Sequence, residues 1–157
     1  RPHALKPNQV EIEALLGQRV DKPGERLAAV RRLLDQGIDE VVLSLGAEGA
    51  VFGSQDGVLW ARTPPIASAN PVGCGDVLVA ALIFTRFRSR VYARPDTHVD
   101  TRGDTQTDTP AERLLWAERA RFSVSAAAAA AARQGGEFPD LAGVRRFLPE
   151  VVLAELV

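Results

Sequence analysis

The residues that could carry chemistry begin with a glycine-rich segment, Gly73-Cys74-Gly75-Asp76, which directly precedes an apolar run. Glycines at a helix start let backbone N–H groups converge on an anion, and the helix dipole adds positive charge there. The backbone donors of Gly73, Cys74 and Gly75 could therefore hold a transferred phosphoryl group. Asp76 would lie on the first helical turn, where its carboxylate could accept the proton of an attacking hydroxyl. Phosphoryl transfer asks a protein mainly for such positioning and charge neutralisation.

Taken alone, this segment more often forms a plain turn, in which Asp76 only caps the helix that follows. Two further segments lie upstream of it. Lys6-Pro7-Asn8 is followed by Glu11, so that Asn8 and Glu11 have the pattern of a capping box for a helix at residues 10–16. Residues 44–49 follow a predicted strand, and alone they would be a β-turn.

The elements that must position these segments follow from the hydrophobic pattern. Residues 40–45 are largely apolar and rich in β-branched side chains, which indicates a strand buried on both faces, as in parallel sheets. Residues 50–52 and 58–61 flank Asp56-Gly57 and predict an antiparallel hairpin. The run at 77–84 is apolar on nearly every side, so we expect a buried helix. Further helices are expected at residues 10–16, ending at Gly17, and at 27–36, 111–133 and 141–148, with an apolar tail to Leu156 and no strand before the first helix.

Composition favours one globular domain that acts on small molecules. Apolar residues make up 46% of the 157 residues and charged residues 25%, which is ordinary for a globular protein. The formal net charge of -1 provides neither the basic field of a nucleic-acid-binding protein nor a polybasic membrane patch. An anionic ligand must therefore be held locally, by loops and a few cations. We expect no nucleic-acid or membrane partner.

The cellular compartment is indicated by what the sequence lacks. Cys74 is the single cysteine, so an intrachain disulfide is impossible and a reducing cytoplasm is favoured. No stretch approaches the roughly 20 apolar residues that span a bilayer, and the start has no signal-peptide pattern. These features predict a cytoplasmic protein. The chain begins at Arg1 and runs almost at once into a helix, which suggests that it starts part-way through a longer protein.

Residues 89–112 differ from the rest of the chain. Arginine and aspartate alternate there with threonine, proline and glycine, and no apolar face is formed. We interpret this stretch as a disordered surface insertion within a single domain of residues 1–157.

The three segments together resemble the ribokinase-like, or PfkB, family of carbohydrate kinases. The family's second signature is a Gly-Ala-Gly-Asp loop before a helix rich in small residues, and residues 72–81 read Val-Gly-Cys-Gly-Asp-Val-Leu-Val-Ala-Ala. Lys6-Pro7-Asn8 with Glu11 resembles its Lys-Pro-Asn-x-x-Glu segment. Residues 44–49 resemble its strand-to-turn segment beside the nucleotide. The sequences of these three segments are similar to those of the hexose-phosphate branch, which contains 1-phosphofructokinase and tagatose-6-phosphate kinase.

The resemblance implies the carboxyl-terminal half of an α/β fold, with a mostly parallel sheet flanked by helices on both faces. It implies ATP and Mg²⁺ as cofactors and a sugar phosphate as substrate. Asp76 would be the general base, and Asn8 and Glu11 would organise Mg²⁺ through water and phosphate. The nucleotide would lie against the strand-to-turn segment and the loop, at Ser44, Leu45, Gly46, Ala47, Glu48, Gly49, Gly75, Asp76 and Asn8.

Several features depart from the family pattern. Cys74 replaces an alanine, and Asn70-Pro71 replaces the residues that usually precede the loop; Pro71 removes an N–H donor and fixes φ. The sugar pocket, the first glycine signature and the lid, through which a homodimer often forms, belong to an amino-terminal half that this chain lacks. We therefore expect kinase activity only when that half is supplied.

Other functions remain open at this level. The chain could be a nucleotide-binding remnant without activity, or part of a kinase for a free sugar or nucleoside. His3 and His98 are expected to be solvated, whereas Trp60 and Trp116 are expected to serve in packing.

Overall fold

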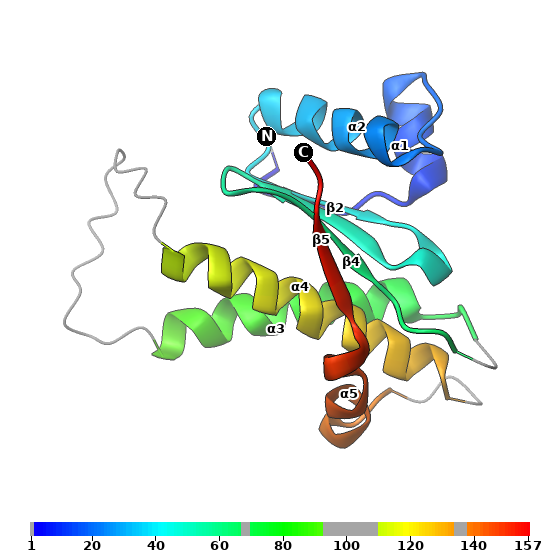
Figure 1. Ribbon diagram of the computed structural model, residues 1–157, viewed down its shortest axis with the longest axis vertical. Coiled ribbons are helices and arrows are strands. Elements are labelled where there is room, and N and C mark those ends of the chain that lie inside the picture. Colours follow the sequence, from blue (N-terminus) through cyan, green and yellow to red (C-terminus); the bar gives the residue numbers. More distant parts are fainter. Residues whose placement is uncertain (1, 67–69, 93–109, 134–137) are drawn as a thin grey trace.

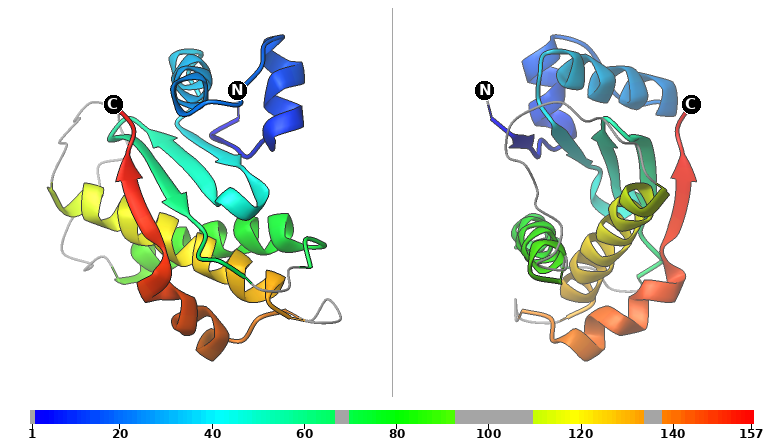
Figure 2. Two further views of the ribbon diagram at one scale, coloured as in Figure 1. Left: turned by 45° about the vertical axis from the view of Figure 1, so that its right-hand side comes forward. Right: turned by 90° about the vertical axis from the view of Figure 1, so that its left-hand side faces the viewer.

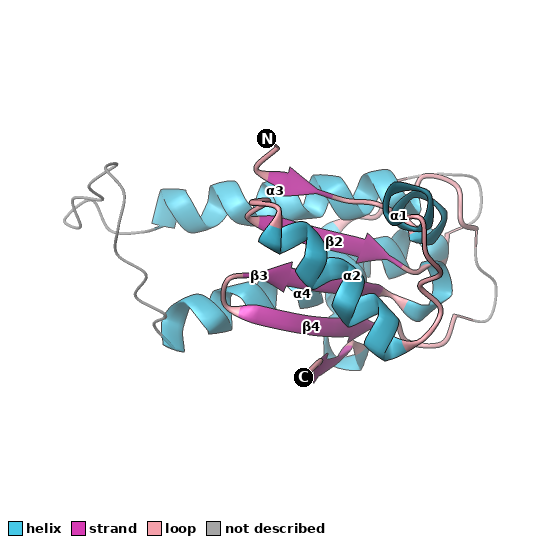
Figure 3. Ribbon diagram, turned by 90° about the horizontal axis from the view of Figure 1, so that it is seen from above, coloured by secondary structure: helices cyan, strands magenta, loops and turns pink. Residues whose placement is uncertain are grey.

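The computed structural model describes residues 2–66, 70–92, 110–133 and 138–157. Within them, a five-stranded sheet has the spatial order β1-β2-β3-β4-β5, which is also the order along the chain (Figure 3). The strands are β1 (Ala4–Leu5), β2 (Glu40–Ser44), β3 (Ala50–Ser54), β4 (Gly57–Arg62) and β5 (Val152–Glu155). Helices cover both faces of the sheet (Figures 1 and 2), so the α/β architecture is confirmed.

The sheet is not mostly parallel, which corrects the expectation from the sequence. β1 and β2 are parallel, whereas the other three neighbouring pairs of described strands are antiparallel. Parallel neighbours need a long crossover connection. The segment between β1 and β2 supplies one through α1 (Gln9–Leu16) and α2 (Pro23–Asp35). The tight turn before Gly57 reverses the chain instead, as the Asp56-Gly57 signal predicted.

The side chains of β2 alternate between two cores, which makes it a strand buried on both faces, as predicted. Val41 and Leu43 face the core under α1 and α2, whereas Val42 faces the opposite core. On that opposite side lie α3 (Cys74–Tyr92), α4 (Pro110–Ala131) and α5 (Leu141–Phe147), as Figure 1 shows. Trp60 and Trp116 are only 6% and 5% exposed, which confirms that both serve in packing.

Two strands and one helix face differ from the prediction. Strand β1 does precede the first helix, and the carboxyl-terminal tail forms β5 beside β4. Helix α3 is not buried all round: Ile83 and Phe84 are 51% and 49% exposed, because the sheet and α4 cover only part of its surface.

No helix in the described residues is long and apolar enough to cross a membrane. Of the predicted insertion, residues 89–92 end α3 and 110–112 begin α4, while 93–109 lie outside the described residues.

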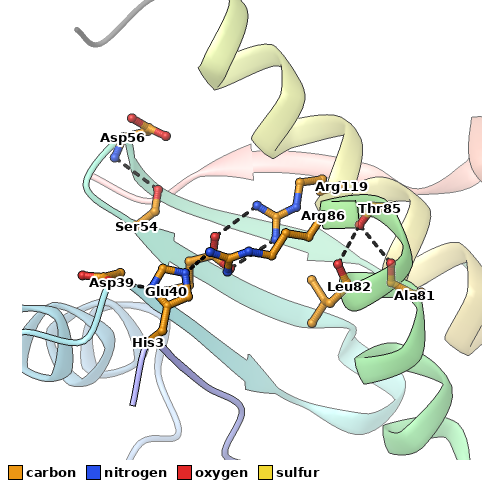
Figure 4. Close-up of polar contacts among 10 residues, drawn as sticks. All are labelled: His3, Asp39, Glu40, Ser54, Asp56, Ala81, Leu82, Thr85, Arg86 and Arg119. Carbon is orange, nitrogen blue, oxygen red and sulfur yellow. Dashed lines mark hydrogen bonds and ion pairs between the residues drawn. The ribbon is translucent and has the colours of Figure 1, made fainter. Parts of the chain in front are cut away.

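A cluster of charged side chains joins α3 and α4 to the start of β2 and to the segments that precede β1 and β2 (Figure 4). Arg119 of α4 donates two hydrogen bonds of 3.1 Å to the Glu40 carboxylate, and Arg86 of α3 lies 3.3 Å from it. His3 contacts the Asp39 carboxylate through Nδ1 and Arg86 through Nε2. His3 is exposed, as expected, but it also has partners; His98 lies outside the described residues. The cluster fixes the end of β2 opposite to Ser44.

Candidate functional site

Asn8 and Glu11 form the predicted capping box at the start of α1. The Asn8 Oδ1 atom accepts the Glu11 N–H at 2.9 Å, and the Glu11 carboxylate accepts the Asn8 N–H at 2.7 Å. Gly17 ends the helix in the left-handed conformation, with φ +67°, as predicted. Both capping side chains are exposed and keep further lone pairs on their oxygens. The structural role of the pair therefore leaves room for a ligand.

Ser44 connects the Lys-Pro-Asn segment to the end of β2. Its N–H donates to the Pro7 carbonyl at 2.9 Å, and its hydroxyl donates to the same carbonyl at 3.3 Å. Asn8 and Ser44 also form a parallel β-bridge. Because β1 and β2 run side by side into these residues, two segments that lie far apart in the sequence end at the same edge of the sheet (Figure 3).

Helix α3 begins inside the glycine-rich loop, at Cys74. Gly73 has φ +77°, which favours glycine, and its carbonyl accepts the N–H groups of Asp76 and Val77 at 3.1 and 3.0 Å. The Cys74 N–H points toward the Pro71 carbonyl at 3.4 Å. Among the described residues, no partner accepts the N–H of Gly73 or Gly75. These two donors are therefore the ones left for an anion.

Asp76 lies on the first turn of α3 and is exposed, where the sequence analysis placed it. A carboxylate at this position is stabilised by the helix dipole, which provides about 0.3–1 kcal/mol at an exposed site. Its backbone N–H is occupied by Gly73, so Asp76 can act on a ligand only through its side chain.

Lys6 is a further candidate site residue, to which the sequence alone assigned no role. A Cβ atom added at Gly75 would lie 3.9 Å from the Lys6 ammonium nitrogen. Lys6 is half-buried and makes no ion pair with a described residue. An unpaired cation beside the free N–H of Gly75 would create a local positive site for a phosphate. The Lys-Pro-Asn motif was the available signal, but only the fold shows that Lys6 reaches the loop.

The turn at Gly46–Glu48, which the sequence analysis expected to contact the nucleotide, is fixed by side-chain contacts from elsewhere. Arg26 of α2 is buried and donates two hydrogen bonds of 2.9 Å to the Glu48 carboxylate. The Trp60 indole N–H donates to the Glu48 carbonyl at 3.0 Å, and the Arg26 guanidinium lies 5.0 Å from the Trp60 ring centre. The Glu48 side chain is thus committed to holding the turn. Its backbone neighbours at Leu45, Gly46 and Ala47 remain the candidates for nucleotide contact.

The Arg26–Glu48 pair should make stability depend on pH. The hydrogen bonds from Arg26 lower the pKa of Glu48 below its ordinary value of 4.5. A carboxylate whose pKa is lowered by folding contributes stability that is complete above its ordinary pKa. This stability is lost as the pH falls through the pKa of the folded state. We expect Glu48→Gln to reduce the free energy of unfolding by about 1–2 kcal/mol at pH 7, since the carboxylate is partly solvated. The difference from the parent chain should shrink below pH 4.5.

A double-mutant cycle with Arg26→Met provides the control for this expectation. In the Arg26→Met chain, Glu48→Gln should have little further effect, and that effect should not vary with pH. Urea unfolding of the four chains at pH 7 and pH 4 measures both quantities. An equal loss from Glu48→Gln at the two pH values would contradict the assignment.

The described residues contain no group of three or more His, Cys, Asp or Glu that could enclose a metal ion. Asn8 and Glu11 offer one amide and one carboxylate oxygen at an exposed edge. This set fits Mg²⁺, because Mg²⁺ usually retains several waters and takes only one or two carboxylates together with substrate phosphate oxygens. It does not fit a transition metal, which prefers imidazole or thiolate ligands.

The fold therefore brings together the Lys-Pro-Asn segment, the end of β2 and the glycine-rich loop. Contacts join Gly75 to Lys6, and Pro7 to Ser44. Within the described residues, no hydrogen bond or ion pair joins the Gly46–Glu48 turn or Glu11 to the 73–76 loop. These parts share one end of the sheet and would meet only through a ligand.

Several proteins that are similar to this chain in sequence or fold are named as phosphofructokinases or as ribokinase. The 1-phosphofructokinase of Xanthomonas campestris is 43% identical over 81 residues, which are 52% of this chain and 26% of that protein. Phosphofructokinase-2 of Escherichia coli superimposes with a TM-score of 0.72 at 25% identity, over 94% of this chain and 40% of that one. Ribokinase of Thermotoga maritima has the same fold, with a TM-score of 0.64 at 21% identity, over 94% of this chain and 42% of that one. The chain thus spans less than half the length of these proteins.

The model of the family described as "pfkB family carbohydrate kinase" matches residues 1–138, which include the Lys-Pro-Asn segment, the end of β2 and the glycine-rich loop. With that match over most of its length, the chain belongs to the pfkB family of carbohydrate kinases.

Proposed function

We propose that this chain is the nucleotide-binding and phosphoryl-transfer part of an ATP- and Mg²⁺-dependent kinase that acts on a hydroxyl of a sugar phosphate. One observation carries the proposal: the unpaired Lys6 ammonium lies beside Gly75, in a loop whose Gly73 and Gly75 N–H groups have no described partner. Several relatives are named 1-phosphofructokinase, which supports a phosphorylated sugar as the acceptor.

In this proposal the chain's own residues position the transferred phosphoryl group and neutralise its charge. The N–H groups of Gly73 and Gly75 and the Lys6 ammonium bind the oxygens of the transferred phosphoryl group. Asp76 accepts the proton of the attacking hydroxyl as the new P–O bond forms and the bond to ADP breaks. Mg²⁺ held near Asn8 and Glu11 would shield the phosphate charges. The turn after β2 would lie against the nucleotide.

The proposal is tested by supplying the part that the relatives have and this chain lacks. The chain would be joined to the amino-terminal half of the Xanthomonas 1-phosphofructokinase, and ADP formation followed with fructose 1-phosphate or free fructose. We expect ADP formation that requires the phosphorylated sugar. Turnover with free fructose alone would instead favour a kinase for an unphosphorylated sugar. No turnover with any sugar, at normal ATP affinity, would favour the binding remnant below.

The second function is nucleotide binding without phosphoryl transfer. The chain matches 26% of one relative and 40% of one structural neighbour, so nucleotide binding is measured separately from transfer. Calorimetry on the chain alone separates the two steps: MgATP binding is expected under both functions. Absence of MgATP binding would contradict both.

Lys6→Met should weaken MgATP binding by about 10- to 100-fold, which corresponds to the loss of one charge-assisted contact of about 1.5–3 kcal/mol. Methionine retains the length and the apolar stem of lysine, so the fold should be unaffected. Lys22→Met is the matched control, because Lys22 is the only other lysine in the sequence and is exposed at the start of α2. Equal affinities of the two variants in calorimetry would remove Lys6 from the site.

A further inference from the structure

We propose that Asn70 is a positioning residue that holds the glycine-rich loop in its phosphate-binding conformation, together with the thiol of Cys74. The inference rests on the proposed function, because it concerns the geometry of the same anion site. Neither residue was assigned this role from the sequence, where Asn70-Pro71 and Cys74 stood out only as departures from the family pattern.

Three different groups of Asn70 bind three different parts of the structure. Its N–H donates to the carbonyl of Ala131, the last residue of α4, at 2.8 Å. Its side-chain Oδ1 accepts the Val72 N–H at 3.1 Å, which forms an Asx-turn. Its carbonyl accepts the Cys74 thiol at 3.1 Å. Asn70 therefore connects the end of α4, the loop and the first residue of α3.

These hydrogen bonds compensate for the missing N–H of Pro71 and for an unpaired carbonyl at the end of α4. Pro71 has no N–H to offer, and the carbonyls at the end of a helix such as α4 have no partner within the helix. The Asn70 N–H satisfies one of these carbonyls and thereby ties the loop to α4. The Cys74 thiol is half-buried, and burial raises its pKa, so that it remains an S–H donor. The alanine usual at this position in the family could not make that bond.

The position of the loop matters because transfer depends on small distances. A displacement of about 1 Å in a catalytic group can reduce turnover about 100-fold. Gly73, with φ +77°, has no heavy atom near the place of its missing side chain, so nothing packs against the loop there. The bonds of Asn70 and Cys74 then fix the direction of the two free N–H groups.

The test uses Cys74 as a reporter, because it is the only cysteine in the sequence. Asn70→Ala removes the Oδ1 acceptor, and we expect iodoacetamide to alkylate Cys74 about fivefold faster, since the loop then opens more often. Asn70→Asp keeps the acceptor and should restore slow alkylation. Asn70→Ala should also weaken MgATP binding, because the loop is then less well positioned. Asn70→Asp should not restore this affinity, because its negative charge lies beside the phosphate site. Gln18→Ala, at an exposed residue after α1, is the control and should change neither value.

The outcomes separate this inference from the proposed function. Asn70→Ala with an unchanged alkylation rate and unchanged MgATP affinity would overturn the positioning role. If Asn70→Ala lowered the melting temperature and accelerated alkylation, but Asn70→Asp failed to slow it, Asn70 would be a packing residue only. MgATP that does not slow alkylation of the parent chain would overturn the proposed function itself.

Cys74→Ser should retain MgATP affinity better than Cys74→Ala, because a hydroxyl can donate to Asn70 as the thiol does.

Discussion

Asp76→Asn is expected to reduce sugar-dependent ADP formation by the completed kinase about 100- to 10,000-fold, the usual contribution of a general base. Asparagine has the same shape as aspartate but cannot take a proton from the attacking hydroxyl. MgATP binding should persist, because Lys6 and the loop N–H groups are unchanged. Stability should change little, since an exposed carboxylate on a first helical turn contributes only about 0.3–1 kcal/mol.

The same substitution distinguishes the base from a simple helix cap. If Asp76 only stabilised the start of α3, Asp76→Asn would lower the melting temperature slightly and leave turnover in place. Asp35→Asn is a matched control, because Asp35 is an exposed aspartate at the end of α2, where no catalytic role is proposed. Turnover of Asp76→Asn within twofold of the Asp35→Asn value would remove Asp76 as the base.

Features that depend on neighbouring residues could be predicted from the sequence. The capping box of Asn8 and Glu11, the end of α1 at Gly17 and the hairpin at Gly57 each follow from backbone requirements that a few adjacent residues satisfy. The buried strand β2 followed from its apolar run. For the same reason, the glycine-rich loop could be placed at the start of α3 before the fold was known.

Features that depend on distant residues could not be predicted in this way. The two residues of β1 have too short a pattern to indicate a strand, and they form one because Glu40 and Val41 pair with them. The end of the chain becomes β5 only because β4 offers a free edge. The direction of pairing was wrong for a related reason: apolar content indicates that a strand is buried, but the connection between strands decides whether neighbours are parallel.

The candidate site shows the same division. The motifs identified Asn8, Glu11 and residues 73–76, but sequence spacing gave no role to Lys6, which reaches Gly75 only across the fold. Nor could it show that the Glu48 carboxylate is paired with Arg26, 22 positions earlier in the chain. A motif thus names residues that share a region, while their individual tasks depend on partners from other elements.

The two glycines of the turn after β2 show how different those tasks are, and Gly49→Ala should have the largest effect on stability. An added Cβ at Gly49 would lie 2.0 Å from the Ala61 carbonyl oxygen and 2.8 Å from the Thr63 nitrogen. Both are backbone atoms, and Ala61 is paired with Ala50 in the β3–β4 ladder. Gly49 also has φ +95°, which a side chain rarely adopts. Strain and overpacking together should reduce the free energy of unfolding by about 3 kcal/mol or more.

Gly46→Ala provides the control within the same turn. Gly46 also has a positive φ, of +58°, but no heavy atom lies within 4 Å of the place of its missing Cβ. This substitution should cost about 1–2 kcal/mol, the penalty of the left-handed conformation alone. If the nucleotide approaches the backbone at Gly46, as the proposed function requires, Gly46→Ala should fold normally yet bind MgATP less tightly. Urea unfolding and calorimetry measure the two effects. Equal losses of stability at Gly46 and Gly49 would show that backbone conformation alone, and not the contact with β4, requires glycine at position 49.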